Sequence, residues 1–250
     1  MTFITSDMAI AALDREQAAQ LQTLLNEKGF DAGKVDGIMG PKTYKAWGNF
    51  KRSQNLGQLD RIGPASLKTL QDLSVNPGLL TWVQAATIFP RITEFQFTEL
   101  NRCLKQFDIN TVPRQCHFLS QCGHESGGLK YVKEIDKGWY IPKKFNLPAI
   151  AASDGAYKYR GSGVIQLSMP DNYRAFSKFM GDPKIYDKGC PYVAANYPFS
   201  SAGFWWLNNN MNALCDRGAT VEQITRRVNG GLNGLADRQS WYSRISNVLT

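Results

Sequence analysis

The chain lacks any long apolar segment. Although 43% of its 250 residues are hydrophobic, no uninterrupted apolar run approaches the roughly 20 residues that a membrane-spanning helix requires. The first ten residues, MTFITSDMAI, contain no basic residue, and the overlapping AIAAL segment is too short for the core of a signal peptide. We therefore expect no signal peptide and no stable membrane insertion, so that the protein stays in the cytoplasm until another protein releases it.

Histidine and cysteine are also scarce. The chain holds two histidines, His117 and His124, and five cysteines, Cys103, Cys116, Cys122, Cys190 and Cys215. An odd number of cysteines at irregular spacing does not resemble a disulfide framework, and no pair of them has zinc-site spacing. A His-Glu-x-x-His zinc site would need a second histidine where the chain has Gly128. We expect no metal, no cofactor and small buried thiols.

The positive charge is unevenly distributed, and no segment is rich in lysine and arginine. Residues 1–73 hold nine basic and eight acidic side chains, whereas the remainder holds twenty basic and thirteen acidic ones, a net charge of +7 out of +8. A basic surface favours anionic partners such as nucleic acid, membrane headgroups or an acidic polymer like a bacterial cell wall. Without a basic run, we expect no direct binding of nucleic acid.

Residues 14–73 predict three short helices. The first runs from about Glu16 to Lys28, with Asp14 as its N-cap and Gln17 completing a capping box. The second and third open at Pro41 and Pro64, because proline suits the first position of a helix. The segments DGIMGPKTYKAW and DRIGPASLKTL repeat one pattern, a tight turn followed by a helix.

The order Leu-Gln, Leu, Gly, Asp-Gly and Gly-Pro-x-Thr in this segment resembles the small three-helix peptidoglycan-binding domain attached to many wall hydrolases. The stretch NFKRSQ and the Asp60-Arg61 pair depart from the usual family pattern. The resemblance implies a wall-binding domain at residues 1–73. Asn-Pro-Gly turn chemistry then predicts a linker at residues 74–80, followed by a second domain at 81–250.

The second segment reads as mainly α-helical. An apolar face recurs over 97–107 at helical spacing. Thr111 is placed to cap the next helix, which ends near 123–128. Thr220 and Gln223 form a capping-box pattern for a later helix. Between them, residues 157–169 are β-branched and interrupted by glycine, which predicts a loop with a short strand.

Two glutamates lie in the stretch GHESGGLKYVKE. Cleavage of a glycosidic bond needs two carboxyl groups in different protonation states. Glu125 ends an apolar helix, and burial raises a carboxyl pKa, which suits a general acid. Glu134 follows a Gly-Gly break and has lysines nearby, which favour the ionised form that suits a general base. The residues alone leave open that both glutamates are simply solvated.

Three segments in order resemble the family 19 glycoside hydrolases, which include chitinases and phage or bacterial wall lysozymes with a mainly α-helical, lysozyme-like fold. They are FDINTVPRQCHFLSQCGHESGGLKYVKE, YKYRGSGVIQLSMPDNY and ITRRVNGGLNGLADR. The likeness covers about residues 81–250. Together with the wall-binding segment, it resembles a modular phage endolysin.

The resemblance implies a role for each matching residue. Glu125 matches the general acid, Glu134 the general base, and Ser168 the hydroxyl residue that helps to hold the attacking water. The matching substrate-side positions are Gln166, Asn172, Asn229 and Arg238, and Arg238 would orient or balance the base carboxylate. Tyr159 is one of several aromatic residues beside these segments that could stack on sugar faces.

Some details depart from the family. Gly161-Ser162-Gly163 replaces the usual Gly-Arg-Gly, and Met169-Pro170 replaces the commoner Gly-Arg, so subsite details do not transfer. Asn172 and Gln166 also have purely structural alternatives: Asn172 suits a cap of the helix that contains Tyr173, and Gln166 suits a tie to a strand. Arg238 equally suits a bridge between helices.

Four functions compete. The favoured one is a monomeric endolysin that binds peptidoglycan and hydrolyses the β-1,4 bond between N-acetylmuramic acid and N-acetylglucosamine with inversion, released to the wall by a separate holin-type pore. A chitinase would use the same residues, and a lytic transglycosylase would use Glu125 alone. A wall-binding protein with a decayed hydrolase domain is the non-enzymatic alternative, which the intact Glu125, Glu134 and Ser168 set disfavours.

Overall fold

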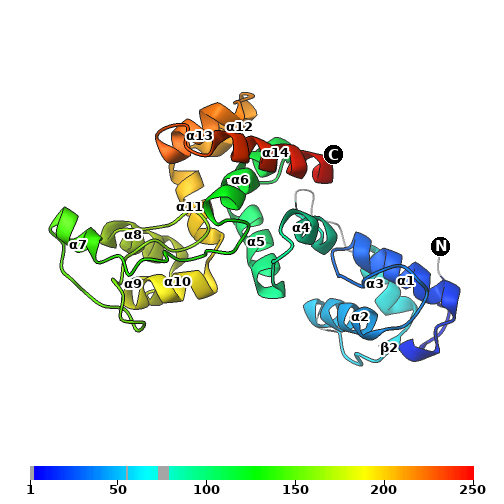
Figure 1. Cartoon of the computed structure of the whole chain (residues 1–250). Coiled ribbons are helices and arrows are strands. Elements are labelled where there is room, and N and C mark those ends of the chain that lie inside the picture. The colour runs from blue at the N-terminus through cyan, green and yellow to red at the C-terminus, as the bar shows by residue number, and fades with distance from the viewer. Residues whose placement is uncertain (1–2, 55, 73–78) are drawn as a thin grey trace. The chain divides into compact units, whose positions relative to one another are not determined.

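The chain folds as two compact units, Met1–Ala85 and Ala86–Thr250, in a computed structural model that describes residues 3–54, 56–72 and 79–250. Both units are mainly helical, as Figure 1 shows. The division falls within helix α4 (Trp82–Ile88). Most of the expected linker, residues 74–78, lies outside the described residues, so the linker stays a prediction. Among the described residues, no helix is both long and apolar enough to cross a membrane.

The first unit contains the three predicted helices, α1 (Arg15–Glu27), α2 (Pro41–Ser53) and α3 (Pro64–Asp72). Asp14 and Gln17 form the expected capping box, and both prolines occupy the first helical position. A pair of two-residue strands, β1 (Met8–Ala9) and β2 (Arg61–Ile62), joins antiparallel beside them. Strands this short have no periodicity to read, so the sequence did not predict them.

The residues that carry the resemblance in this unit hold its fold together. Gln22 is 1% exposed, and its amide nitrogen lies 3.0 Å from Asp36 Oδ1 and 3.2 Å from Thr43 Oγ1. Its amide oxygen accepts from the backbone N–H groups of Asp36 and Gly37. A buried amide that is satisfied at both ends fixes the turn before α2 to the middle of α1.

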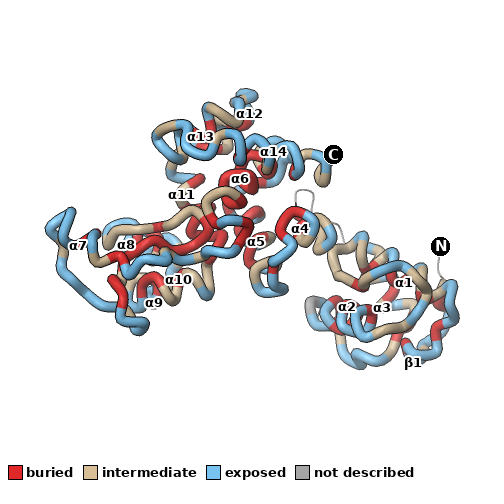
Figure 2. Tube along the Cα trace, in the orientation of Figure 1, coloured by how far each residue is buried: buried red, intermediate tan, exposed pale blue. Residues whose placement is uncertain are grey.

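The second unit is organised around helix α6 (Val112–Glu125), which is buried along most of its length (Figure 2). It packs against α14 (Leu235–Leu249), the last helix. A Cβ atom at Gly123 would lie 2.5 Å from Trp241 Cδ2, so only glycine permits this approach. The last turn of α6 is therefore pressed against α14.

Eight further helices complete the second unit. They are α5 (Glu94–Gln106), α7 (Tyr140–Phe145), α8 (Pro170–Met180), α9 (Lys184–Lys188), α10 (Cys190–Asn196), α11 (Ser200–Asn208), α12 (Met211–Asp216) and α13 (Val221–Asn229). The capping box of Thr220 and Gln223 is confirmed at α13. Thr111 occupies the N-cap of α6, but its side chain makes no capping hydrogen bond.

The expected short strand at residues 157–169 is wrong. The structure has only isolated bridges there, from Ser162 to Lys133 and to Leu167 and from Tyr157 to Ala151. Positive φ angles of 78° at Gly163, 63° at Gln166 and 75° at Met169 interrupt any extended run. The segment is a folded loop, and it lies against the residues around Glu134.

All five cysteines are buried and unpaired, as the sequence predicted. His117 is also buried, and its ring packs against that of Tyr242 with centroids 4.6 Å apart. Removal from water lowers the pKa of His117 to about 4, so this histidine is neutral at physiological pH.

Candidate active site

Glu125 is the last residue of α6, and the chain turns sharply after it. Ser126 donates its hydroxyl to Cys122 O at 2.6 Å and accepts from Leu129 N at 2.9 Å. Gly127 and Gly128 follow with φ angles of 57° and 66°, a region that favours glycine. The Glu125 side chain keeps 25% exposure, so its carboxylate is half-buried at the end of a buried helix.

Arg238 binds the Glu125 carboxylate. Its Nη2 lies 2.5 Å from Glu125 Oε1, and its Nη1 donates to the buried Gln121 Oε1 one turn earlier. The expectation that Arg238 orients Glu134 is therefore corrected. Because α14 packs along α6, an arginine in the first turn of α14 faces the last turn of α6.

His124 joins the same two helices. Its Nδ1 lies 2.7 Å from Asp237 Oδ2, and a Cβ atom at Gly234 would lie 2.2 Å from its Nε2. The segments GHES and NGLADR thus pack on each other through a histidine and a glycine. From the sequence, His124 was considered only as a metal ligand, so this contact was not predicted.

Glu134 is held by the folded loop 157–169. Its backbone N–H donates to Gly161 O at 2.9 Å, and its Oε2 accepts from Gly161 N at 2.8 Å. The Gly163 N–H donates to Val132 O at 2.8 Å beside them. Both backbone and side chain of Glu134 are thus fixed to Gly161, which lies 27 residues later in the chain.

The lysines around Glu134 have other partners in the described structure. Lys133 Nζ lies 3.7 Å from Asp154 Oδ2, and Lys130 lies over the ring of Tyr131. Asp154 also receives the buried guanidinium of Arg160. Burial would raise the pKa of Asp154, but the hydrogen bond and charge of Arg160 lower it overall. One carboxylate therefore links the residue before Glu134 to the residue before Gly161.

Tyr140, the first residue of α7, is a further partner of Glu134. Burial, followed by a hydrogen bond with the Glu134 side chain, raises the pKa of the Tyr140 hydroxyl. The side chain is nevertheless 53% exposed. Tyr140 can therefore support Glu134 while its ring stays accessible.

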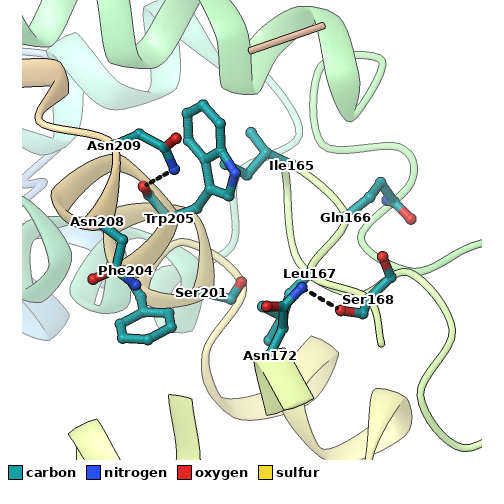
Figure 3. Close-up of a pocket in the computed structure, with 10 residues that line it drawn as sticks. All are labelled: Ile165, Gln166, Leu167, Ser168, Asn172, Ser201, Phe204, Trp205, Asn208 and Asn209. Carbon is teal, nitrogen blue, oxygen red and sulfur yellow. Dashed lines mark hydrogen bonds between the residues drawn. The ribbon is translucent and has the colours of Figure 1, made fainter. Parts of the chain in front are cut away.

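A pocket of about 300 Å³ lies between the folded loop and helix α11 (Figure 3). It is lined by Ile165, Gln166, Leu167, Ser168, Asn172, Ser201, Phe204, Trp205, Asn208 and Asn209. Three residues predicted from the sequence, Gln166, Ser168 and Asn172, thus share one pocket. Its lining does not include the two glutamates.

The three predicted residues in the pocket differ in how far they are engaged. Asn172 Nδ2 donates to Ser168 O at 2.8 Å, and Gln166 Nε2 donates to Gly163 O at 3.2 Å. The Ser168 hydroxyl makes no hydrogen bond to the part of the chain that the structure describes. It is thus available to a water molecule or a ligand.

Comparison with known proteins identifies the family to which the chain belongs. No family-level sequence profile matches the chain. A Haemophilus influenzae protein described as a glycosyl hydrolase family 19 domain-containing protein is 31% identical over 191 residues, which cover 63% of this chain and 91% of that protein. The chain belongs to glycosyl hydrolase family 19. It is therefore a glycoside hydrolase.

Two Arabidopsis thaliana endochitinases are similar to parts of this family 19 hydrolase. They are 34% and 33% identical over 113 and 131 residues, or 45% and 52% of the chain. The matches span only 38% and 44% of the lengths of those endochitinases.

Solved structures confirm the mainly helical fold. Chitinase C from Streptomyces griseus superposes with a TM-score of 0.54 at 22% identity, covering 70% of this chain and 94% of that one. A bacterial family 19 chitinase gives a TM-score of 0.56 at 25% identity, with 68% and 95% covered.

Two predicted residues of this family 19 hydrolase lie apart from the pocket. Tyr159 is 2% exposed and stacks on Tyr186 with centroids 5.0 Å apart. The expected sugar stacking by Tyr159 is therefore corrected, because neighbouring rings cover it. Asn229 is the exposed last residue of α13 and is not among the residues that line the pocket.

Sequence reasoning also missed the helix α11 side of the pocket. In this hydrolase the segment GFWWLNNN places Phe204, Trp205, Asn208 and Asn209 along one wall. The available signal was an apolar helix that ends in consecutive amides. Apolar helices are usually core, and only the packing reveals which of these side chains face a pocket.

Proposed function

We propose that this family 19 hydrolase cleaves peptidoglycan at the β-1,4 bond between N-acetylmuramic acid and N-acetylglucosamine. One observation carries the proposal of a two-carboxylate mechanism: the two glutamates are held by independent supports. Their roles as acid and base follow from the family resemblance. Arg238 binds Glu125 from helix α14, and Gly161 binds Glu134 from the folded loop. Carboxylates fixed in different surroundings suit the division into acid and base.

The proposed reaction inverts the anomeric carbon. Protonated Glu125 transfers its proton to the leaving glycosidic oxygen. Glu134 accepts a proton from a water molecule, whose oxygen bonds to the anomeric carbon from the opposite face of the ring. Such a mechanism places the carboxyl groups about 6.5–9.5 Å apart, with water between them. The free Ser168 hydroxyl is the proposed second partner for that water.

Peptidoglycan is the proposed substrate because of the first unit and the charge of the second. In the first unit, three residues of the pattern that resembles a wall-binding domain are hydrogen-bonded to one another: Gln22 donates to Asp36 and to Thr43. The strongly basic remainder of the chain suits an acidic polymer. We propose a monomeric endolysin that stays in the host cytoplasm until a holin-type pore releases it to the wall.

Product analysis on purified sacculi tests this proposal. Mass spectrometry after borohydride reduction should find N-acetylmuramic acid at the new reducing ends, and NMR of early products should show inverted configuration. Retained configuration, or reducing N-acetylglucosamine ends alone, would contradict it. Products with 1,6-anhydro ends that still form with Glu134→Gln would identify a lytic transglycosylase. Normal binding without any cleavage would identify a binding protein.

A second candidate function is hydrolysis of chitin. The printed names of the Arabidopsis relatives and of both solved structures above describe them as chitinases. Release of reducing ends from chitin and from sacculi, measured at equal enzyme concentration, separates the two candidates. Faster release from chitin would favour this second function, in which Glu125 and Glu134 keep their roles.

A further inference from the structure

The helix α11 wall of the pocket carries no assigned role. The opposite wall contains Gln166, Ser168 and Asn172, whose roles follow from the family resemblance. Figure 3 shows Trp205 and Asn208 on the α11 side, across the hollow from Gln166 and Ser168. We propose that Trp205 and Asn208 form a subsite that binds the N-acetyl group of an amino sugar. This deepens the proposed function, on which the choice of an N-acetylated polymer rests.

The chemistry of the lining selects the ligand. None of the ten residues that line the pocket carries a charge. In a basic protein, a pocket without lysine or arginine is poorly suited to a carboxylate, such as a lactyl or peptide group. Aromatic rings beside amides and a hydroxyl suit a neutral group with a methyl, a donor and an acceptor. The N-acetyl group has these three parts.

Trp205 differs from its neighbour in a way that points to a ligand. Trp206 is 1% exposed, and its indole N–H donates to Asn212 Oδ1 at 2.9 Å. Trp205 is half-buried, and its indole N–H has no hydrogen-bond partner among the described residues. Tryptophan usually pairs its N–H when it serves the core. Trp206 is thus a core residue, whereas Trp205 lines the pocket with a half-buried ring and an N–H that no described residue accepts.

The two asparagines that follow also divide by role. Asn209 Nδ2 donates to Trp205 O at 2.9 Å, which closes the end of α11. The side chain of Asn208 makes no hydrogen bond to the described part of the chain. Its amide can therefore donate to and accept from the amide of an N-acetyl group, while Trp205 covers the methyl.

The test compares binding of acetylated and deacetylated sugars. The probes are an N-acetylglucosamine tetramer and the matching glucosamine tetramer, titrated by calorimetry into the Glu125→Gln protein. We expect the Glu125→Gln protein to prefer the acetylated tetramer. Adding Trp205→Ala or Asn208→Ala should weaken its binding roughly tenfold, as loss of apolar contact or of a hydrogen bond requires, and leave the deacetylated tetramer unchanged. Trp205→Phe should keep most of the preference.

Leu207→Ala is the matched control, because Leu207 lies on the same helix, is 43% exposed and does not line the pocket. Thermal unfolding of each variant checks that it is folded, and Asn208→Ala carries the test if Trp205→Ala unfolds. An unchanged preference in a folded Trp205→Ala or Asn208→Ala protein would overturn the subsite. Failure of the proposed function is distinguishable, because wild-type cleavage of chitin but not of sacculi would refute peptidoglycan and leave this result intact.

Discussion

Arg238 Nη2 lies 2.5 Å from Glu125 Oε1, although 113 residues separate the two in the chain. The Arg238 side chain is 1% exposed and the Glu125 side chain 25% exposed. The pair therefore joins the last turn of α6 to the first turn of α14 at the edge of the core. Both the stability of this junction and the placement of the proposed acid depend on it.

Loss of Arg238 should destabilise the protein and reduce its activity. Arg238→Ala leaves Glu125 and the buried Gln121 without their partner. Breaking a buried ion pair costs about 3–5 kcal/mol, and the partial exposure of Glu125 puts the expected loss nearer to about 2 kcal/mol. Urea denaturation measures it. Arg244→Ala, which removes an exposed arginine from the same helix, should cost less than about 1 kcal/mol.

A side chain at Gly161 should impair catalysis through Glu134. A Cβ atom there would lie 2.3 Å from Gln166 Oε1 and 3.3 Å from Gln166 Cβ, so Gly161→Ala must displace the Gln166 side chain within the loop that anchors the Glu134 carboxylate. We expect kcat to fall by at least about tenfold, because small misplacements of a catalytic group are costly. Steady-state kinetics on a soluble oligosaccharide tests this. Gly57→Ala is the control, because a Cβ atom at Gly57 would have no neighbouring atom within 4 Å. Unchanged kinetics in Gly161→Ala would contradict the proposed anchoring.

Substitution of the two proposed catalytic residues Glu125 and Ser168 should lower kcat by different factors. Glu125→Gln keeps the size of the side chain but cannot supply the proton, so kcat should fall by about 10²–10⁴. Ser168→Ala removes one proposed hydrogen bond to water and should cost about tenfold. Both rates come from the same soluble substrate. A Ser168→Ala enzyme as impaired as Glu125→Gln would require a more direct role for the hydroxyl.

Stability should fall as pH drops from about 6.5 to about 4 because of His117. Burial lowers the pKa of His117 from 6.5 to about 4, so over this range the unfolded chain takes up a proton that the folded protein does not. The free energy of unfolding should decrease by about 3 kcal/mol across this window and level off below it. Urea denaturation at several pH values measures the change.

His117→Gln is the comparison for this pH dependence. It removes the titrating group, so the difference between wild type and variant should shrink as pH falls through the same window. A difference that stays constant from pH 7 to pH 4 would show that His117 does not cause the effect.

Local features of the fold were predictable because their causes are local. The capping boxes of Asp14 with Gln17 and of Thr220 with Gln223 involve residues three positions apart. The strand expected at 157–169 failed where β-branched composition suggested one structure and positive backbone angles at Gln166 and Met169 imposed another. Neither residue is a glycine, so the composition gave no sign of these left-handed angles.

The sequence by itself determined that this protein is mainly helical, and it selected Glu125, Glu134 and Ser168 as the residues to examine. Only the tertiary structure decided that Arg238 contacts Glu125, that Tyr159 lies under other rings, and that helix α11 forms a wall of the pocket. The reason is physical. Helix starts and glycine breaks follow from contacts within a few residues, whereas the partner of a buried arginine depends on which helices pack together.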